Sequence, residues 1–200
     1  MNLLDFIIYL GTFVFALTGA LKARVFKMDI FGGSVLAFVT AYGGGTIRDL
    51  LIGIQPVNWI NDRIALALVI VGTISVFFVN ENKERFQKSI FIFDAIGLGA
   101  FTATGIQISL NSGLNHIYSL IMGVITATFG GLIADIFCSA IPFILRRGEL
   151  YATACAIGGF VYVILDMLDL KHNINLMICM VIIVGIRAYV KRKELKLPGI

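Results

Sequence analysis

The chain has 200 residues, of which 58% are hydrophobic and only 14% are charged, and its mean hydropathy is +0.94. Soluble domains are typically about 45–50% apolar and about 25% charged, so this composition excludes an ordinary water-soluble domain. The net charge of +4 does not indicate nucleic-acid binding, because the basic residues lie between apolar runs. We therefore expect an integral membrane protein that contacts membrane lipid and has no nucleic-acid partner.

Seven apolar segments are long enough to cross a membrane, since a spanning helix needs about 20 residues. In chain order they are 3–21, 30–52, 62–79, 90–109, 116–137, 150–168 and 173–190. The first segment lacks the basic start of a signal peptide and is longer than a typical signal-peptide core, so we interpret it as a retained helix. These spans leave only short loops, with no room for a soluble catalytic domain.

Lysine and arginine residues fall unevenly on the two sides that seven alternating spans define. One side receives Lys22, Arg24, Lys27, Lys83, Arg85, Lys88, Arg146, Arg147, Arg187, Lys191, Arg192, Lys193 and Lys196. The other side receives Arg63 and Lys171, while Arg48 lies inside a span. Because basic loops stay in the cytoplasm, we expect a multi-pass protein of the inner cell membrane with its amino terminus outside and its carboxyl terminus in the cytoplasm.

An internal repeat with an offset of 86 residues relates Asp49 to Asp135. The same register pairs Gly11 with Gly97, Phe15 with Phe101, Thr18 with Thr104, Gly19 with Gly105, Thr40 with Thr126, Gly44 with Gly130 and Pro56 with Pro142. Each copy holds three spans, an odd number, so the second copy enters the membrane from the opposite face. We expect an all-α membrane fold with inverted three-helix repeats over 1–85 and 86–170, followed by a seventh helix and a basic tail over 171–200.

Glycine motifs lie in the middle of the second and fifth spans. The candidate pore residues around them are Thr40, Gly43, Gly44, Gly45, Thr46, Arg48 and Asp49 in the first copy and Thr126, Phe129, Gly130, Gly131 and Asp135 in the second. Consecutive glycines weaken a helix by about 1 kcal/mol each and favour a break whose free carbonyls must line a cavity. The alternative is that the glycines let two helices pack closely. Matching motifs in both repeats, each followed by an aspartate, favour the functional break.

Charged residues inside the apolar segments need partners. A buried carboxylate such as Asp49 or Asp135 costs at least about 2.5–3.5 kcal/mol in a span, so it usually pairs or faces a cavity, although near a helix end it is also a structural anchor. Arg48 and Asp49 point about 100° apart on a helix, so we expect each to find its partner on another helix. We interpret Lys22 and Arg187 as topology anchors rather than gating charges.

The sequence contains no motif for metal binding or for covalent catalysis. His116 and His172 fall in loops without the spacing of metal ligands, and Cys138, Cys155 and Cys179 lie in apolar segments without a C-x-x-C pair. The sequence has no Walker-type loop and no Ser-His-Asp arrangement. We expect no cofactor, no bound metal and no enzymatic activity.

The repeated glycine motifs, the two three-helix units and the seventh helix resemble the prokaryotic members of the trimeric intracellular cation (TRIC) channel family, which overlaps a bacterial family described as a glycine transporter domain. The resemblance implies a homotrimer with one hourglass pore per protomer, conducting monovalent cations, chiefly potassium and also sodium. It places Gly43–Gly45 and Gly130 with Gly131 at kinks beside the constriction. Because Phe129 stands where a third glycine would be, the two half-sites are not equivalent. The span 90–109 contains no Lys or Arg, so voltage sensing through it is not expected.

The pattern leaves three functional hypotheses open. The first is a passive cation channel in which Asp49 and Asp135 attract the ion, while freed carbonyls or Thr46 replace its water. The second is an alternating-access transporter of a small zwitterion such as glycine, whose carboxylate would bind at the half-helix amino termini that follow the breaks. The third is a structural membrane protein whose glycines serve trimer packing.

Overall fold

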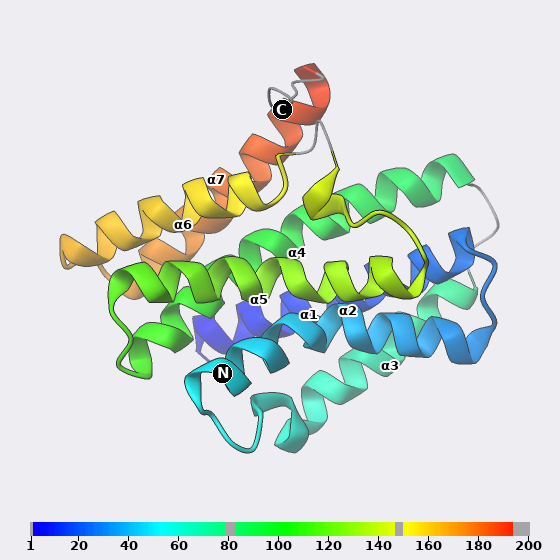
Figure 1. The fold of residues 1–200 in the computed structure, drawn as a ribbon, viewed down its shortest axis with the longest axis horizontal. Coiled ribbons are helices and arrows are strands. Elements are labelled where there is room, and N and C mark those ends of the chain that lie inside the picture. The colour runs from blue at the N-terminus through cyan, green and yellow to red at the C-terminus, as the bar shows by residue number, and fades with distance from the viewer. Residues whose placement is uncertain (1, 79–82, 147–149, 194–200) are drawn as a thin grey trace.

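The computed structural model describes residues 2–78, 83–146 and 150–193, and in these ranges the chain forms seven α-helices and two 3-10 helices. They are α1 (Leu3–Val25), α2 (Ile30–Ile52), η1 (Asn58–Asn61), α3 (Arg63–Phe77), α4 (Lys83–Asn111), α5 (His116–Phe137), η2 (Phe143–Leu145), α6 (Ala152–Met167) and α7 (His172–Lys193) (Figure 1). The all-α fold with seven apolar helices is confirmed. Residue 79 at the end of the third predicted span, Arg147 and Lys196 lie outside the described residues.

The helix bounds agree best with the sequence where apolar runs end in capping residues. Helices α2 and α5 coincide with the predicted segments 30–52 and 116–137. Helix α4 starts seven residues before the predicted 90–109, because its polar first turns are good helix formers that continue beyond the apolar run. Five of the helices are long and apolar enough to span a membrane by length and composition, whereas α3 and α6 are shorter apolar helices of 15 and 16 residues.

The second helix of each repeat begins at an equivalent capping residue. The Asp29 carboxylate accepts the Gly32 main-chain N–H at 2.8 Å, and the Asn115 side-chain oxygen accepts the Tyr118 N–H at 3.1 Å. Both oxygens satisfy a main-chain donor that the first helical turn leaves free. Asp29 and Asn115 are 86 residues apart, so the repeat extends to the signal that starts the helix.

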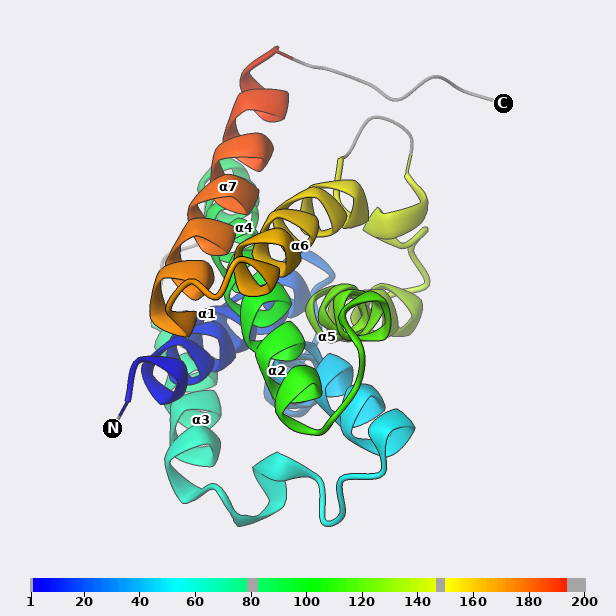
Figure 2. The same cartoon turned by 90° about the vertical axis from the view of Figure 1, so that its left-hand side faces the viewer.

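Helices α1 and α4 form the centre of the bundle, with α3 on one side and α6 and α7 on the other (Figures 1 and 2). Their buried faces carry small residues, among them Ala16 and Ala20 on α1 and Ala100 and Ala103 on α4. Small side chains let helices approach closely inside a membrane, where packing replaces the hydrophobic effect as the main source of association.

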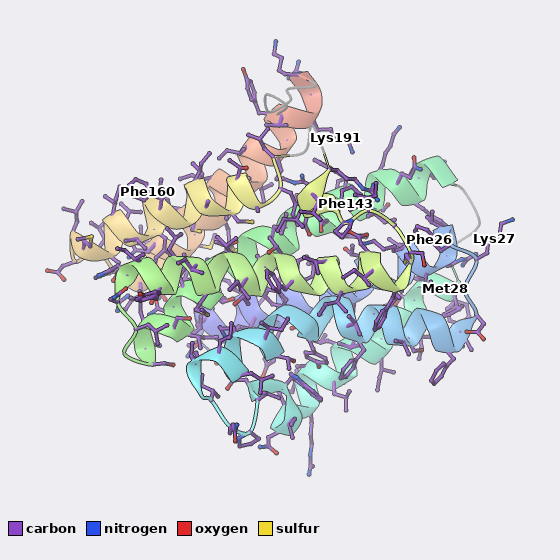
Figure 3. All side chains as sticks on the ribbon, viewed as in Figure 1. Phe26, Lys27, Met28, Phe143, Phe160 and Lys191 are labelled. Atoms are coloured by element: carbon purple, nitrogen blue, oxygen red, sulfur yellow. The ribbon has the colours of Figure 1, made fainter. Side chains whose placement is uncertain are left out.

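The outer surface of the bundle is apolar. Large hydrophobic side chains point outward from several helices, as Phe160 on α6 shows in Figure 3. Others are Ile64, Leu66, Ile70 and Ile74 on α3, Ile157 and Ile164 on α6, and Met177 and Val181 on α7. A soluble monomer rarely exposes a continuous apolar surface of this kind, whereas lipid contact requires one.

Candidate functional site

The helices enclose two cavities at opposite ends of α1 and α4. The first, here the Asp49 cavity, has a volume of about 400 Å³ and is lined by α1, α2, η1, α3, α4 and α5, with Thr12 and Asp49 among its residues. The second, here the Asp135 cavity, has a volume of about 430 Å³ and is lined by Thr18, Phe26, Asp135, Phe143 and Lys191 among others. Figure 3 labels Phe26, Phe143 and Lys191 on this side of the molecule.

The two cavities are equivalent features of the two repeats. Residues that line one cavity have partners 86 positions away that line the other: Ile8 and Asp94, Thr18 and Thr104, Lys22 and Ile108, Val25 and Asn111, Phe26 and Ser112, Asp49 and Asp135, and Ala65 and Tyr151. The inversion of the repeats places these equivalent surfaces at opposite ends of the bundle.

The packed part of the bundle between the two cavities is here called the septum. Thr12 lines one cavity and Thr18 the other, and these two residues are about 9 Å apart along the α1 axis. Within this septum the Phe15 and Phe101 rings meet edge to face, with centroids 5.0 Å apart. A Cβ at Gly11 would lie 2.7 Å from the Phe101 ring, and one at Gly97 would collide with the Phe15 ring. Each phenylalanine therefore needs a glycine on the other repeat.

The predicted glycine motifs lie where α2 and α5 cross. A Cβ at Gly44 would collide with the carbonyl oxygen of Thr126, and one at Gly130 would collide with the carbonyl oxygen of Thr40. A Cβ at Gly43 would lie 3.2 Å from the Cα of Gly130. The contact is reciprocal between the repeats, and it requires residues without side chains on both helices.

Helices α2 and α5 are continuous through these motifs, over Ile30–Ile52 and His116–Phe137. Neither motif therefore ends its helix, and the close-packing alternative describes the contacts of Gly44 and Gly130. The kink with freed carbonyls stays a prediction. The half-helix amino termini that were expected to hold a carboxylate are absent from α2 and α5. Glycines are needed here because α2 and α5 approach each other closely. A single sequence does not reveal how closely two helices approach.

The predicted threonines use their hydroxyl protons within their own helices. The Thr40 hydroxyl donates to the Leu36 carbonyl at 2.6 Å, and the Thr126 hydroxyl donates to the Met122 carbonyl at 2.6 Å. The Thr46 hydroxyl donates to the Tyr42 carbonyl at 2.8 Å and accepts the indole N–H of Trp59 at 2.9 Å. Thr126 also lines the Asp49 cavity.

The remaining motif residues have different surroundings. Gly45 lines the Asp49 cavity, and the nearest atom to a Cβ there would be a guanidinium nitrogen of Arg48 at 3.8 Å. A Cβ at Gly131 would lie 2.8 Å from the Tyr151 hydroxyl. Phe129 is half-buried on α5. The two motifs therefore differ in their contacts as well as in their sequence.

Asp49 is buried at the end of α2, with an exposed fraction of 1%. The Arg48 Nε and Nη2 atoms donate to its Oδ1 at 3.0 and 2.6 Å, and its Oδ2 accepts the Asn58 main-chain N–H at 2.8 Å. The prediction that Arg48 and Asp49 pair with other helices is wrong, because the long arginine side chain folds back to its neighbour. Asp49 thereby joins the end of α2 to the start of η1.

Asp135 has the same role at the end of α5 but a different cation. The Lys22 ammonium donates to its Oδ1 at 2.7 Å, and the Phe143 main-chain N–H donates to its Oδ2 at 2.9 Å. Lys22 is only 6% exposed, so its side chain is held in a buried ion pair, while its role as a topology anchor stays a prediction. The repeat places Ala134 where Arg48 stands, which leaves Asp135 to take its cation from α1.

A third, partly buried ion pair, which the sequence did not identify as a site, joins α4 to α7. The Arg187 Nη2 donates to Asp94 Oδ2 at 3.1 Å, and the Tyr151 hydroxyl donates to Asp94 Oδ1 at 3.1 Å. Arg187 is 4% exposed and its guanidinium lies 4.9 Å from the Phe91 ring centroid, so its side chain is buried in the protein, while its role as a topology anchor stays a prediction. The sequence feature that could have identified this pair is Asp94, a carboxylate one turn inside an apolar run.

The two histidines of the chain share one carboxylate. His116 Nε2 lies 3.2 Å from Asp166 Oδ2, and His172 Nδ1 lies 3.3 Å from Asp166 Oδ1. This contact joins the start of α5, the end of α6 and the start of α7. Across the described ranges no three metal-ligating side chains are placed to hold a metal ion.

Two inverted three-helix repeats, which enclose equivalent cavities on either side of a septum, define the architecture of a membrane transport protein. The model of the family described as "Glycine transporter" matches the chain twice, over residues 5–81 and 91–167. The second match begins 86 residues after the first, the same offset as the repeat. The chain belongs to this family, and by its structure to the TRIC channels.

Individual relatives match along nearly the whole chain. The UPF0126 inner membrane protein YadS of Escherichia coli strain K12 is 38% identical over 190 residues, which cover 94% of this chain and 91% of that protein. A structure of the TRIC channel orthologue from Rhodobacter sphaeroides has a TM-score of 0.88 at 35% identity and covers 98% of this chain and all of that one. A second structure, described in terms of conductance through TRIC cation channels, has a TM-score of 0.87 at 35% identity and covers 98% of this chain and 96% of that one.

Proposed function

We propose that the protein is a homotrimeric channel for monovalent cations, K⁺ above all and Na⁺ in addition, with one pore in each protomer. The pore runs from the Asp49 cavity across the septum at Phe15 and Phe101 to the Asp135 cavity. The pair of equivalent cavities separated by about 9 Å of helix is the observation that carries this proposal. The similarity to structures described as cation channels supports cations as the permeant species.

Threonine oxygens, rather than freed carbonyls, are the ligands that this path offers to a cation. The Thr18 and Thr104 hydroxyls line the two cavities at equivalent positions, and each donates its proton to a carbonyl one turn earlier at 2.8 Å. A hydroxyl that has given its proton to the helix presents lone pairs to the cavity. Such oxygens replace part of the water around a passing ion.

The carboxylates of the path are compensated by the protein's own cations. Arg48 pairs with Asp49 and Lys22 pairs with Asp135. Each of these two carboxylates therefore contributes a polar group to its cavity, and its charge is balanced by a cation of the protein. We infer that the pairs hold the ends of α2 and α5 in place and moderate the attraction of a cation. A bare carboxylate in the same place would bind the ion too tightly for rapid passage.

We propose that the Asp135 cavity faces the cytoplasm and the Asp49 cavity the opposite side of the membrane. The basic loops and the basic end of α7 lie at the Asp135 end. A cysteine at Lys27 or Ser112 tests this, since both positions are exposed and the three native cysteines are buried. A membrane-impermeant thiol reagent should label the Ser112→Cys variant in intact cells and leave Lys27→Cys unlabelled; the reverse pattern would overturn the orientation.

Reconstitution into planar bilayers tests the channel directly. Under a KCl gradient we expect unitary currents that reverse near the K⁺ equilibrium potential. A complete lack of current at every potential, from protein that is folded and inserted, would overturn the proposal. The mass of the protein in mild detergent tests the trimer separately, and a monomer would contradict that part.

The runner-up is an alternating-access transporter of a small zwitterion such as glycine. The family description and the septum closed by Phe15 and Phe101 favour it, because alternating access needs two cavities that are never joined. Concentrative, saturable uptake of labelled glycine into vesicles would favour the transporter over the channel. The transport-family matches favour either function over an enzyme.

A further inference from the structure

Three aromatic rings form a cluster beside the Asp49 cavity. Tyr42 and Trp59 stack with their ring centroids 5.1 Å apart, and Phe38 packs edge-on against both at 4.9 and 5.0 Å. Tyr42 comes from α2 and Trp59 from η1, and both line the cavity. The negative face of an aromatic ring attracts cations, and tryptophan attracts them most strongly.

Asp62 adds a carboxylate to the same cavity. Its Oδ1 caps α3 by accepting the N–H groups of Ile64 and Ala65 at 3.0 and 2.9 Å. Within the described residues no lysine or arginine pairs with Asp62. The Tyr42 hydroxyl, on a side chain that is 5% exposed, has no hydrogen-bond partner in the same part of the chain. Beside the aromatic rings, the cavity therefore holds a carboxylate whose described partners are neutral donors, the α3 N–H groups and the Tyr9 hydroxyl, and not a lysine or arginine.

The equivalent Asp135 cavity differs because the protein's own cations cover its aromatic rings. Phe143 lies beneath Arg146 at 4.1 Å, and Phe91 lies beneath Lys191 at 3.6 Å. In the described ranges no such cation lies over Tyr42 or Trp59.

The charges on the two linings also differ. The lining of the Asp49 cavity has one basic and two acidic side chains, whereas that of the Asp135 cavity has four basic and two acidic ones. Of the two equivalent cavities, the Asp49 cavity alone combines an acidic excess with aromatic rings that have no described lysine or arginine over them.

We propose that the Asp49 cavity binds small organic ammonium ions. The Tyr42 and Trp59 rings would contact the alkyl groups and the spread positive charge, while Asp62 supplies the opposite charge. A volume of about 400 Å³ lies within the common range of small-molecule sites. This site goes beyond the proposed channel function, since binding in the cavity does not require conduction.

Trp59 is the single tryptophan of the chain, so its fluorescence reports on this cavity alone. Purified full-length protein is titrated with tetramethylammonium chloride at constant ionic strength, with KCl as the matched salt. We expect a saturable change in Trp59 emission with tetramethylammonium and no comparable change with KCl. A linear response, or the same response to both salts, would overturn the proposal.

Variants separate a site from a general salt effect. Asp62→Asn keeps the helix cap, because Asn caps as well as Asp does, and Tyr42→Leu removes one ring. We expect each to weaken the apparent affinity by about 3- to 30-fold, the range of cation–π and partly buried charge contacts. Tyr42→Phe should keep the affinity.

The matched control is Phe143→Leu, which removes a ring from the other cavity and should leave the affinity unchanged. Unchanged affinity in Asp62→Asn, whatever the fold of Tyr42→Leu, would overturn the assignment. Because the readout is binding, a protein that conducts K⁺ without this response would disprove the site and leave the channel standing. A protein that binds tetramethylammonium but carries no current would support the site and contradict the channel.

Discussion

Phe15 and Phe101 meet edge to face between the two cavities, with ring centroids 5.0 Å apart and an interplanar angle of 81°. One ring comes from each repeat, and each packs where the other repeat has a glycine. In the proposed pore these two rings define the narrowest passage. Conduction through that pore would depend on how far the two rings separate.

Shortening one of the two rings should widen the passage. We expect Phe15→Leu to raise the unitary K⁺ conductance or the fraction of time that the pore is open, because Leu cannot reach across the septum as the ring does. Single-channel recording of the purified variant measures both quantities. Phe160→Leu, at an exposed position on the outer face of α6, is the control and should behave as the wild type does. An unchanged Phe15→Leu current would place the constriction elsewhere.

The α2–α5 crossing predicts different outcomes for neighbouring glycines. Gly44→Ala would force a methyl group against the Thr126 carbonyl, and overpacking of this kind costs about 1–3 kcal/mol, which exceeds the gain in helix propensity of about 1 kcal/mol. Gly45→Ala has an open position and should retain or raise stability. Thermal unfolding in detergent measures the difference. Equal melting temperatures for the two variants would contradict the close contact.

The buried pair of Lys22 and Asp135 predicts a large effect from removing one partner. Lys22→Met keeps the length of the side chain but leaves the carboxylate unpaired, which typically destabilises by about 3–5 kcal/mol. Adding Asp135→Asn should recover much of this loss, because the uncompensated charge is removed. The free energies of unfolding of Lys22→Met, Asp135→Asn and the double variant, compared with the wild type, form a double-mutant cycle. Additive effects in that cycle would show that the two groups do not interact.

The helices and the repeat could be predicted because their signals are local. Apolar runs and capping residues place α2 and α5, and one offset of 86 residues relates Asp29 to Asn115 and Gly44 to Gly130. The predicted helix length was less accurate where a helix extends beyond the apolar run, as α4 does. A polar but helix-forming segment continues a helix without continuing a hydrophobic run.

Partners were harder to predict because they depend on distance in space. Lys22 and Asp135 are 113 residues apart in the chain, and the sequence around each residue does not indicate that the other is its partner. Helix directions alone separate Arg48 from Asp49, but the long arginine side chain reaches back across that angle to its neighbour. The glycines were identified correctly as special, but the sequence could not distinguish a broken helix from a close crossing.

The most direct test of the proposed pore uses two equivalent, exposed positions that line opposite cavities, Phe26 and Ser112. Each is replaced by cysteine, and a charged, membrane-impermeant thiol reagent is added to one side of a bilayer during recording of the K⁺ current. We predict that each variant loses current from one side only, and from opposite sides for the two variants. Current that persists after both cysteines are fully modified would contradict a pore that runs through the two cavities of one protomer.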